Sequence, residues 1–118
     1  MKYFEFGSEN PELMVMLHGG GTSYLGMLPT ANKMAKVYHV VLVAYDGFNP
    51  DEPETEFVSP MDEAKRLGDH IVEHYGGKID ILYGISYGCR VLMEVLSATR
   101  LTITTTIADG MSLRDYPD

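Results

Sequence analysis

The sequence predicts an α/β fold, with a mostly parallel sheet of about five strands and helices on both faces. Apolar runs typical of buried strands alternate along the chain with segments whose apolar residues recur at helical spacing. Residues 39–45 are nearly continuous in apolar β-formers, as a parallel strand covered on both faces is. Strands and helices that alternate in this way are joined by right-handed crossovers. We expect a single domain over residues 1–118.

The elements are expected in the order strand, strand, helix, strand, helix, strand, helix, strand. The first strand is aromatic and alternating, which favours a position at the sheet edge. The predicted strands are 2–6, 12–17, 39–45, 79–83 and 101–108. The predicted helices are a segment with apolar residues from Leu28 to Tyr38, in which Pro29 lies in the first turn, then 60–75 and 90–98.

The second helix has the clearest end signals. Ser59 is a favoured cap, Pro60 suits the first helical position, and acidic residues follow in the first turn. The glycine pair 76–77 is expected to end the helix. Its two histidines, His70 and His74, are spaced as a metal-binding pair can be, but the H-E-x-x-H pattern is missing, and we interpret them as a solvated face.

Composition narrows the function classes. The 118 residues are 45% hydrophobic and carry a net charge of −8, which argues against nucleic-acid binding and against docking on an anionic membrane. Acidic residues are dense between 51 and 56, which we interpret as a solvated, flexible loop. Cys89 is the only cysteine, so an intrachain disulfide is excluded, and we expect it to be a small buried residue. With no signal peptide or membrane span in the sequence, the prediction is a cytoplasmic protein.

The pentapeptide GISYG, at residues 84–88, directly follows the apolar run 79–83 and precedes a predicted helix. A strand that turns sharply into a helix at G-x-S-x-G strains the serine backbone and exposes its hydroxyl. The flanking glycines are needed because side chains there would collide with the neighbouring strand and helix. Ser86 is therefore the candidate nucleophile.

A second motif, HGGG at 18–21, ends the earlier strand. Glycines allow unusual backbone angles and close approach of a substrate, so their N–H groups can stabilise negative charge on an oxygen. Together the two motifs resemble the α/β-hydrolase superfamily, and the resemblance covers nearly the whole chain but only the first half of that fold.

The resemblance implies a serine hydrolase that acts on a small carboxylic ester or similar acyl substrate, without cofactor or metal. It implies that the backbone N–H groups of Tyr87 and Gly20, and also of Gly19 or Gly21, form the oxyanion hole. It also implies that the strand before Ser86 lies near the centre of the sheet. Tyr24 either lines an acyl pocket or packs in the core.

The resemblance is incomplete in one respect. A serine nucleophile needs a histidine base and an orienting carboxylate, and in this superfamily both follow the serine in the chain. All four histidines, His18, His39, His70 and His74, precede Ser86. Asp109 is the candidate acid, because it directly follows the last strand; Asp115 and Asp118 are interpreted as surface charge.

Three explanations of the missing residues remain open: a fragment of a longer hydrolase, a site completed by another chain, or a small protein with a different use for the fold. A non-catalytic binding or assembly module is the alternative function. Strand 101–108 is long, uncharged and rich in β-branched residues, so a free edge there would promote association. We therefore expect a homo-oligomer formed through 101–108.

Overall fold

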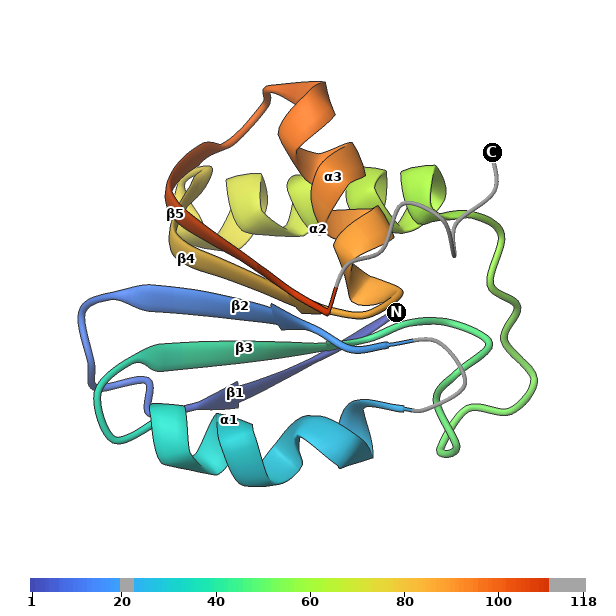
Figure 1. Ribbon diagram of the computed structural model, residues 1–118, viewed down its shortest axis with the longest axis horizontal. Coiled ribbons are helices and arrows are strands. Elements are labelled where there is room, and N and C mark those ends of the chain that lie inside the picture. The colour runs from blue at the N-terminus through green and yellow to red at the C-terminus, as the bar shows by residue number, and fades with distance from the viewer. Residues whose placement is uncertain (20–22, 111–118) are drawn as a thin grey trace.

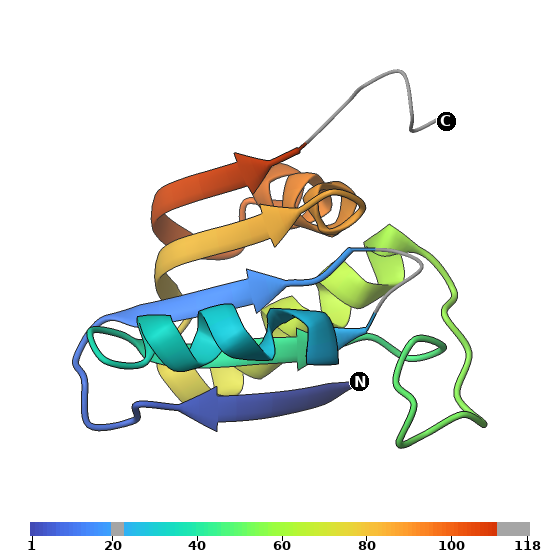
Figure 2. The same ribbon diagram turned by 60° about the horizontal axis from the view of Figure 1, so that its bottom comes forward.

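A five-stranded sheet in the order β1-β3-β2-β4-β5 forms the middle layer of the molecule. The computed structural model describes residues 1–19 and 23–110. The strands are β1 (Lys2–Phe6), β2 (Leu13–Leu17), β3 (His39–Ala44), β4 (Lys78–Ile85) and β5 (Thr102–Asp109). Strands β2 to β5 are parallel, and only β1 runs antiparallel, against β3. The predicted α/β class and the edge position of the first strand are confirmed (Figure 2).

Helices cover both faces of this sheet, as predicted (Figure 1). On one face lie the 3₁₀ helix η1 (Tyr24–Met27) and α1 (Leu28–Met34). On the other lie α2 (Pro60–Tyr75) and α3 (Gly88–Ala98). Each face has its own buried apolar cluster, and the central strand β2, buried along its whole length, contributes to both. No helix within the described residues is long and apolar enough to cross a membrane.

The ends of α2 follow the sequence signals. The Ser59 hydroxyl accepts a hydrogen bond from the Asp62 N–H at 3.0 Å, and Pro60 occupies the first turn. Gly76 ends the helix with φ of 66°, in the left-handed region that glycine adopts without strain. The interpretation of the two histidines as a solvated face holds only for His74, because the His70 ring stacks on Tyr3 with centroids 3.5 Å apart.

Three elements differ from the predicted bounds. The regular part of the first helix ends at Met34 rather than reaching Tyr38, and turns follow in which the Val37 and Tyr38 N–H groups both donate to the Met34 carbonyl, at 3.0 and 2.8 Å. The strand before Ser86 extends over Lys78–Ile85 rather than 79–83, and it lies near the centre of the sheet as expected, between the central strand β2 and the edge strand β5. The last strand is shifted by one residue to Thr102–Asp109.

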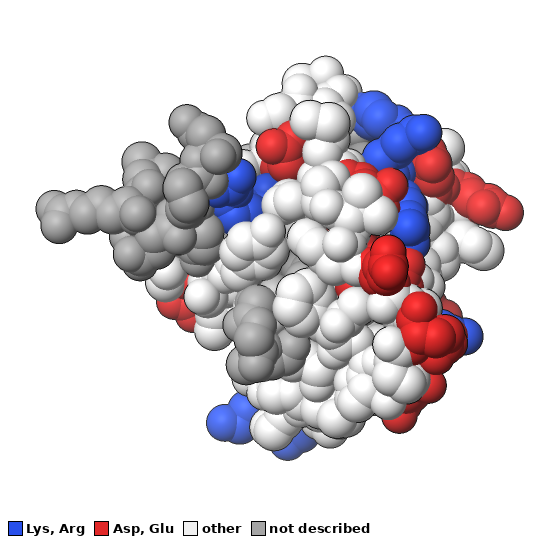
Figure 3. Space-filling model, turned by 90° about the vertical axis from the view of Figure 1, so that its right-hand side faces the viewer, with Lys and Arg blue, Asp and Glu red and all other residues white. Residues whose placement is uncertain are grey.

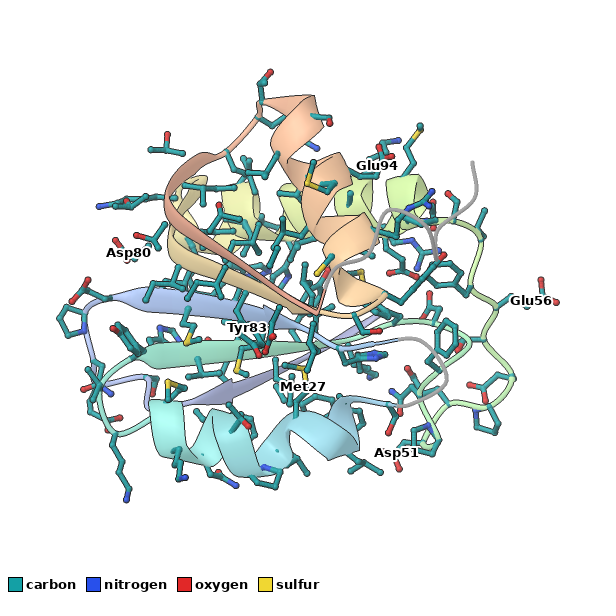
Figure 4. The ribbon with its side chains drawn as sticks, in the orientation of Figure 1. Met27, Asp51, Glu56, Asp80, Tyr83 and Glu94 are labelled. Carbon is teal, nitrogen blue, oxygen red and sulfur yellow. The ribbon has the colours of Figure 1, made fainter. Side chains whose placement is uncertain are left out.

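The acidic loop after β3 is mostly exposed, as predicted, and two of its acids contact other segments of the chain. Asp51 accepts a hydrogen bond from the Tyr24 hydroxyl at 2.7 Å, and Glu52 forms an ion pair with Lys2. Asn49 is only 4% exposed. Tyr24 is itself buried and stacks on Phe4, so it packs in the core. Figure 4 shows Asp51 on this loop, beside the start of the segment that carries α1.

The carboxyl group of Glu63, in the first turn of α2, lies in the interior of the protein. Glu63 is fully buried, and neither of its oxygens has a hydrogen-bond partner within the described residues. Burial raises the pKa of Glu63 to about 7, and the charges of Asp46 and Asp62 add to the rise while Arg66 and the terminal ammonium oppose it. The folded chain therefore holds a proton that the unfolded chain has already released.

This carboxyl makes stability depend on pH. Below pH 4.5, Glu63 is protonated in both the folded and the unfolded chain, so its ionisation does not change the free energy of unfolding. As the pH rises from 4.5 towards about 7, only the unfolded chain releases this proton, which lowers the free energy of unfolding. We expect Glu63→Gln to match the native chain at the acidic end and to exceed its stability above pH 7 by on the order of 3 kcal/mol. The free energies of unfolding in urea, determined below pH 4.5 and above pH 7, measure this difference. Glu73→Gln, an exposed position on the same helix, is the control. A constant difference between the native chain and Glu63→Gln across the range would contradict the prediction.

Candidate active site

Ser86 stands in the tight turn between β4 and α3, at the edge where the parallel strands end. Its φ of 52° lies in the left-handed region, which non-glycine residues rarely occupy, and the residue is exposed. The Ser86 N–H donates to the Asp109 carbonyl at 2.8 Å, so the end of β5 holds the turn in place. This is the strained, exposed geometry that the motif predicts.

The glycines on either side of Ser86 are present for steric reasons. A Cβ on Gly84 would lie 3.0 Å from the Gly88 carbonyl oxygen. A Cβ on Gly88 would overlap the Leu17 carbonyl oxygen and lie 2.8 Å from that of His18. Real Cβ atoms do not approach oxygens so closely, so α3 can begin beside the end of β2 only without side chains here.

The two glycine motifs meet at Ser86. A Cβ on Gly19 would lie 3.4 Å from the Ser86 Cβ and 3.9 Å from its Oγ, so the backbone of the second motif faces the serine side chain. Tyr87 is the N-cap residue of α3, and its N–H lies at the positive end of that helix. Gly19 and Tyr87 are thus on the two sides of Ser86. Gly20, the other predicted donor, and Gly21 lie outside the described residues.

His18 is structural. It is fully buried, and its Nε2 accepts from the Tyr45 N–H at 3.3 Å. Its Nδ1 must then carry the proton and donate to the Gly19 carbonyl at 2.9 Å. Burial lowers the pKa of His18, which favours this neutral form. With both nitrogens engaged, the ring fixes the backbone before Gly19 and has no lone pair for Ser86.

None of the other histidines is placed to act as the base. His39 opens β3 at the opposite edge of the sheet, where it pairs with Glu5 at 2.8 Å. His70 and His74 lie on the last turns of α2, which end at that same opposite edge. Within residues 1–19 and 23–110, which include all four histidines, none of them is therefore a partner of Ser86.

Asp109 lies close to Ser86 through its backbone, but its side chain has another partner. It is the last residue of β5, in register with Ile85, and its carboxylate accepts from the Tyr83 hydroxyl at 2.8 Å. Burial and this hydrogen bond raise the pKa of Tyr83 to about 12. Figure 4 labels Tyr83, which lies on the strand before the turn. The role of Asp109 as the catalytic acid stays a prediction.

The remaining groups near Ser86 do not form a second reactive centre. Cys89 is buried as predicted, with its thiol 3.4 Å from the Gly84 carbonyl oxygen, and burial raises its pKa, which disfavours the reactive thiolate. Over residues 1–19 and 23–110, no three His, Cys, Asp or Glu side chains converge as a metal site. Figure 3 faces this edge, whose middle carries few charged side chains.

Comparison with solved structures identifies the architecture. A protein from Desulfitobacterium hafniense assigned to the α/β hydrolase family superposes on 93% of this chain with a TM-score of 0.83 and 20% identity, over 44% of its own length. A marine microorganism esterase matches 91% of the chain at a TM-score of 0.71 and 18% identity, over 40% of its length. The enzyme 1H-3-hydroxy-4-oxoquinoline 2,4-dioxygenase matches 90% at a TM-score of 0.69 and 22% identity, also over 40%.

The chain has the α/β-hydrolase fold. It spans less than half the length of each of these three α/β-hydrolase-like structures. The sequence matches no family model, and no curated protein sequence is significantly similar to it. Because the neighbours include both an esterase and a dioxygenase, the α/β-hydrolase fold alone does not determine the reaction.

Sequence reasoning missed two features of this edge. It did not find the hydrogen bond between Tyr83 and Asp109, which depends on two strands far apart in the chain. It also made no prediction for Asn49, which precedes the acidic residues of the loop and is buried. The only local signal was the Asn-Pro dipeptide at 49–50, which marks a turn and says nothing about burial.

We expect Gly88→Ala to destabilise the chain by about 1–3 kcal/mol, because the added methyl group overlaps backbone that cannot rotate away. Gly26→Ala is the matched control, since a Cβ there meets nothing within 4 Å. Urea unfolding midpoints of both variants test this expectation. Equal midpoints would mean that the contact between α3 and the end of β2 is loose enough to give way.

Proposed function

We propose that this chain provides the nucleophile and oxyanion hole of a serine hydrolase that acts on a carboxylic ester or similar acyl substrate. The observation that carries the proposal is the left-handed backbone of an exposed Ser86, with Gly19 packed against its side chain. Neither feature is needed for folding alone, because a non-glycine residue at positive φ is strained.

In the proposed reaction the Ser86 Oγ attacks the acyl carbonyl carbon. The carbonyl oxygen becomes an oxyanion, which the N–H groups of Tyr87 and of the 19–21 glycines would stabilise. Collapse of this intermediate breaks the bond to the alcohol, which leaves with a proton, and forms an acyl ester on Ser86. Water then attacks the acyl group, releases the carboxylic acid and regenerates the hydroxyl.

The proton on Ser86 Oγ limits this reaction in the chain as it stands. No histidine is placed to remove it, so we expect turnover to be several orders of magnitude slower than in a complete triad. The proposal is therefore that the nucleophile is built and positioned, but not activated.

Chemical rescue tests the proposal. We expect p-nitrophenyl acetate to acylate Ser86 slowly, and added imidazole to raise that rate because it supplies the missing base. Intact mass followed by peptide mapping measures acylation at Ser86 itself. Ser86→Ala should abolish it, whereas Ser97→Ala, a serine on α3, should not.

Two results would contradict this proposal. Absence of acylation at Ser86 with and without imidazole would favour the non-catalytic binding or assembly module. Fast turnover without imidazole, lost in Ser86→Ala, would show that another group acts as the base.

We also propose that two copies associate through β5. The strand pairs only with β4 within the described residues, and nearly all of its residues are exposed (Figure 2). It is uncharged from Thr102 to Ala108, so it lacks the lysines and prolines that protect natural sheet edges. Two identical edges related by a two-fold axis can pair antiparallel, which satisfies the backbone groups of both.

Light scattering with size-exclusion chromatography tests this association. We expect twice the 13.1 kDa chain mass, and a shift to the monomer in Ile107→Lys, which puts a charge on the free edge. Val72→Lys makes the same change at an exposed position on α2 and should leave the mass unchanged. A native chain that stays monomeric at high concentration would refute the proposal.

A further inference from the structure

Histidines gather at the end of the sheet opposite Ser86, where the parallel strands begin. His39 opens β3, and His70 and His74 lie on the last turns of α2. The Nε2 of His39 is bonded to Glu5 at 2.8 Å. The other two are four residues apart on one helix, and their ring centroids lie 4.4 Å from each other. This is the spacing at which two imidazoles on one helix face can bind the same metal ion.

The separation of the two rings fits a shared ion. An imidazole nitrogen binds Zn²⁺ at about 2.0–2.1 Å, so tetrahedral coordination places the centroids of two ligating rings about 5 Å apart. The observed centroids of His70 and His74 are 4.4 Å apart, and the ring planes are tilted by 42°. Rotation about the side-chain bonds would therefore bring one nitrogen of each ring to the coordination distance.

The protein orients the His70 ring in advance. This ring stacks on Tyr3 of β1, with centroids 3.5 Å apart and planes within 4° of parallel. Tyr75 contacts the same ring at 6.0 Å, and the His70 side chain is half-buried. A ligand that is already held in place loses less conformational freedom on binding, so these contacts favour coordination through His70.

The nitrogens of both rings are open to an ion. Within the described residues neither ring forms a hydrogen bond, because His70 makes ring contacts and the Nε2 of His74 lies 4.0 Å from the Glu73 carboxylate. Burial and the neighbouring His74 lower the pKa of His70, which favours the neutral imidazole that binds metals. The charges of Glu5 and Glu73 act on His70 in the opposite direction, and they would attract a cation.

The ligand types restrict the kind of ion. Imidazole nitrogen suits Zn²⁺ and Cu²⁺, whereas Mg²⁺ and Ca²⁺ prefer oxygen ligands. Over residues 1–19 and 23–110, no third His, Cys, Asp or Glu side chain converges on the pair, so water would fill the other coordination positions. For a given set of ligands, Cu²⁺ is bound more tightly than Zn²⁺.

We propose that His70 and His74 form a two-histidine site for Zn²⁺ or Cu²⁺ on the last turns of α2. The site lies at the opposite end of the sheet from Ser86, so it does not depend on the proposed hydrolase chemistry. A bound ion links two successive turns of α2. It stabilises the folded chain, because the unfolded chain does not hold the two rings together.

Titration of the chain, without an affinity tag, with zinc chloride tests the proposal. Calorimetry gives the Kd, and the imidazole ¹⁵N resonances of the histidines identify the ligands. We expect equimolar binding that shifts the resonances of His70 and His74 and leaves those of His18 and His39 unchanged. Copper chloride should bind more tightly than zinc chloride in calorimetry, and magnesium chloride should not bind.

Variants isolate the pair. His74→Ala removes one ligand at an exposed position and should weaken Zn²⁺ binding by at least about 10-fold, since loss of an outer-shell partner alone can cost that much. His39→Gln removes a histidine outside the pair and should leave the Kd unchanged. Val72→His combined with His74→Ala keeps the number of histidines on α2 but puts the second ring on another face, so it should bind as weakly as His74→Ala.

Two results would overturn the proposal. One is equal Zn²⁺ affinity of the native chain and His74→Ala. The other is a set of zinc-induced shifts that omits the His70 and His74 rings, which would show an adventitious ion only. The backbone amide spectrum of His74→Ala checks that the variant is folded. None of these measurements involves acylation of Ser86, so the metal site and the proposed function stand or fail separately.

Discussion

The close contact between the end of β2 and the start of α3 is the constraint on which this edge of the molecule depends. The backbone of Gly88 lies against the carbonyls of Leu17 and His18, where not even a methyl group fits. This contact fixes where α3 begins, and so it fixes the turn that carries Ser86. The same contact places Gly19 beside the serine side chain. Ser86 and its neighbouring glycine backbone are thus positioned by a single backbone-to-backbone approach.

His18 supports that approach from the other side. Its ring bonds to the Tyr45 N–H on the β3 side and to the Gly19 carbonyl after β2. It therefore connects the exits of two adjacent parallel strands and sets the path of the chain into the glycines. Because His18 is buried and both its ring nitrogens are engaged, it is not available as a base for Ser86, although it directly precedes Gly19.

Sequence patterns predicted the parts of this structure that local rules determine. The buried strands, the Ser59 cap and the Gly76 end of α2 follow from apolar spacing and turn chemistry, and the Ser86 turn follows from its glycines. The partners of side chains from distant elements could not be predicted in this way. Asp109 bonds to Tyr83 because β4 and β5 are neighbours in the sheet. Most of the residues at 51–56 are exposed, as their acidic composition predicts, whereas the composition gave no sign that the preceding Asn49 is buried.

The hydrogen bond from the Ser86 N–H to the Asp109 carbonyl has a consequence for regulation. Asp109 ends β5, which pairs only with β4 among the described residues, so the backbone of Ser86 is bonded directly to an edge strand of the sheet. Any strand that adds to β5 reduces the motion of Asp109 and, through this bond, that of Ser86. Such a link is reciprocal, because a ligand that orders the serine turn also orders the edge and favours the added strand. If two copies pair through β5 as proposed, their association and the conformation of Ser86 would therefore be coupled.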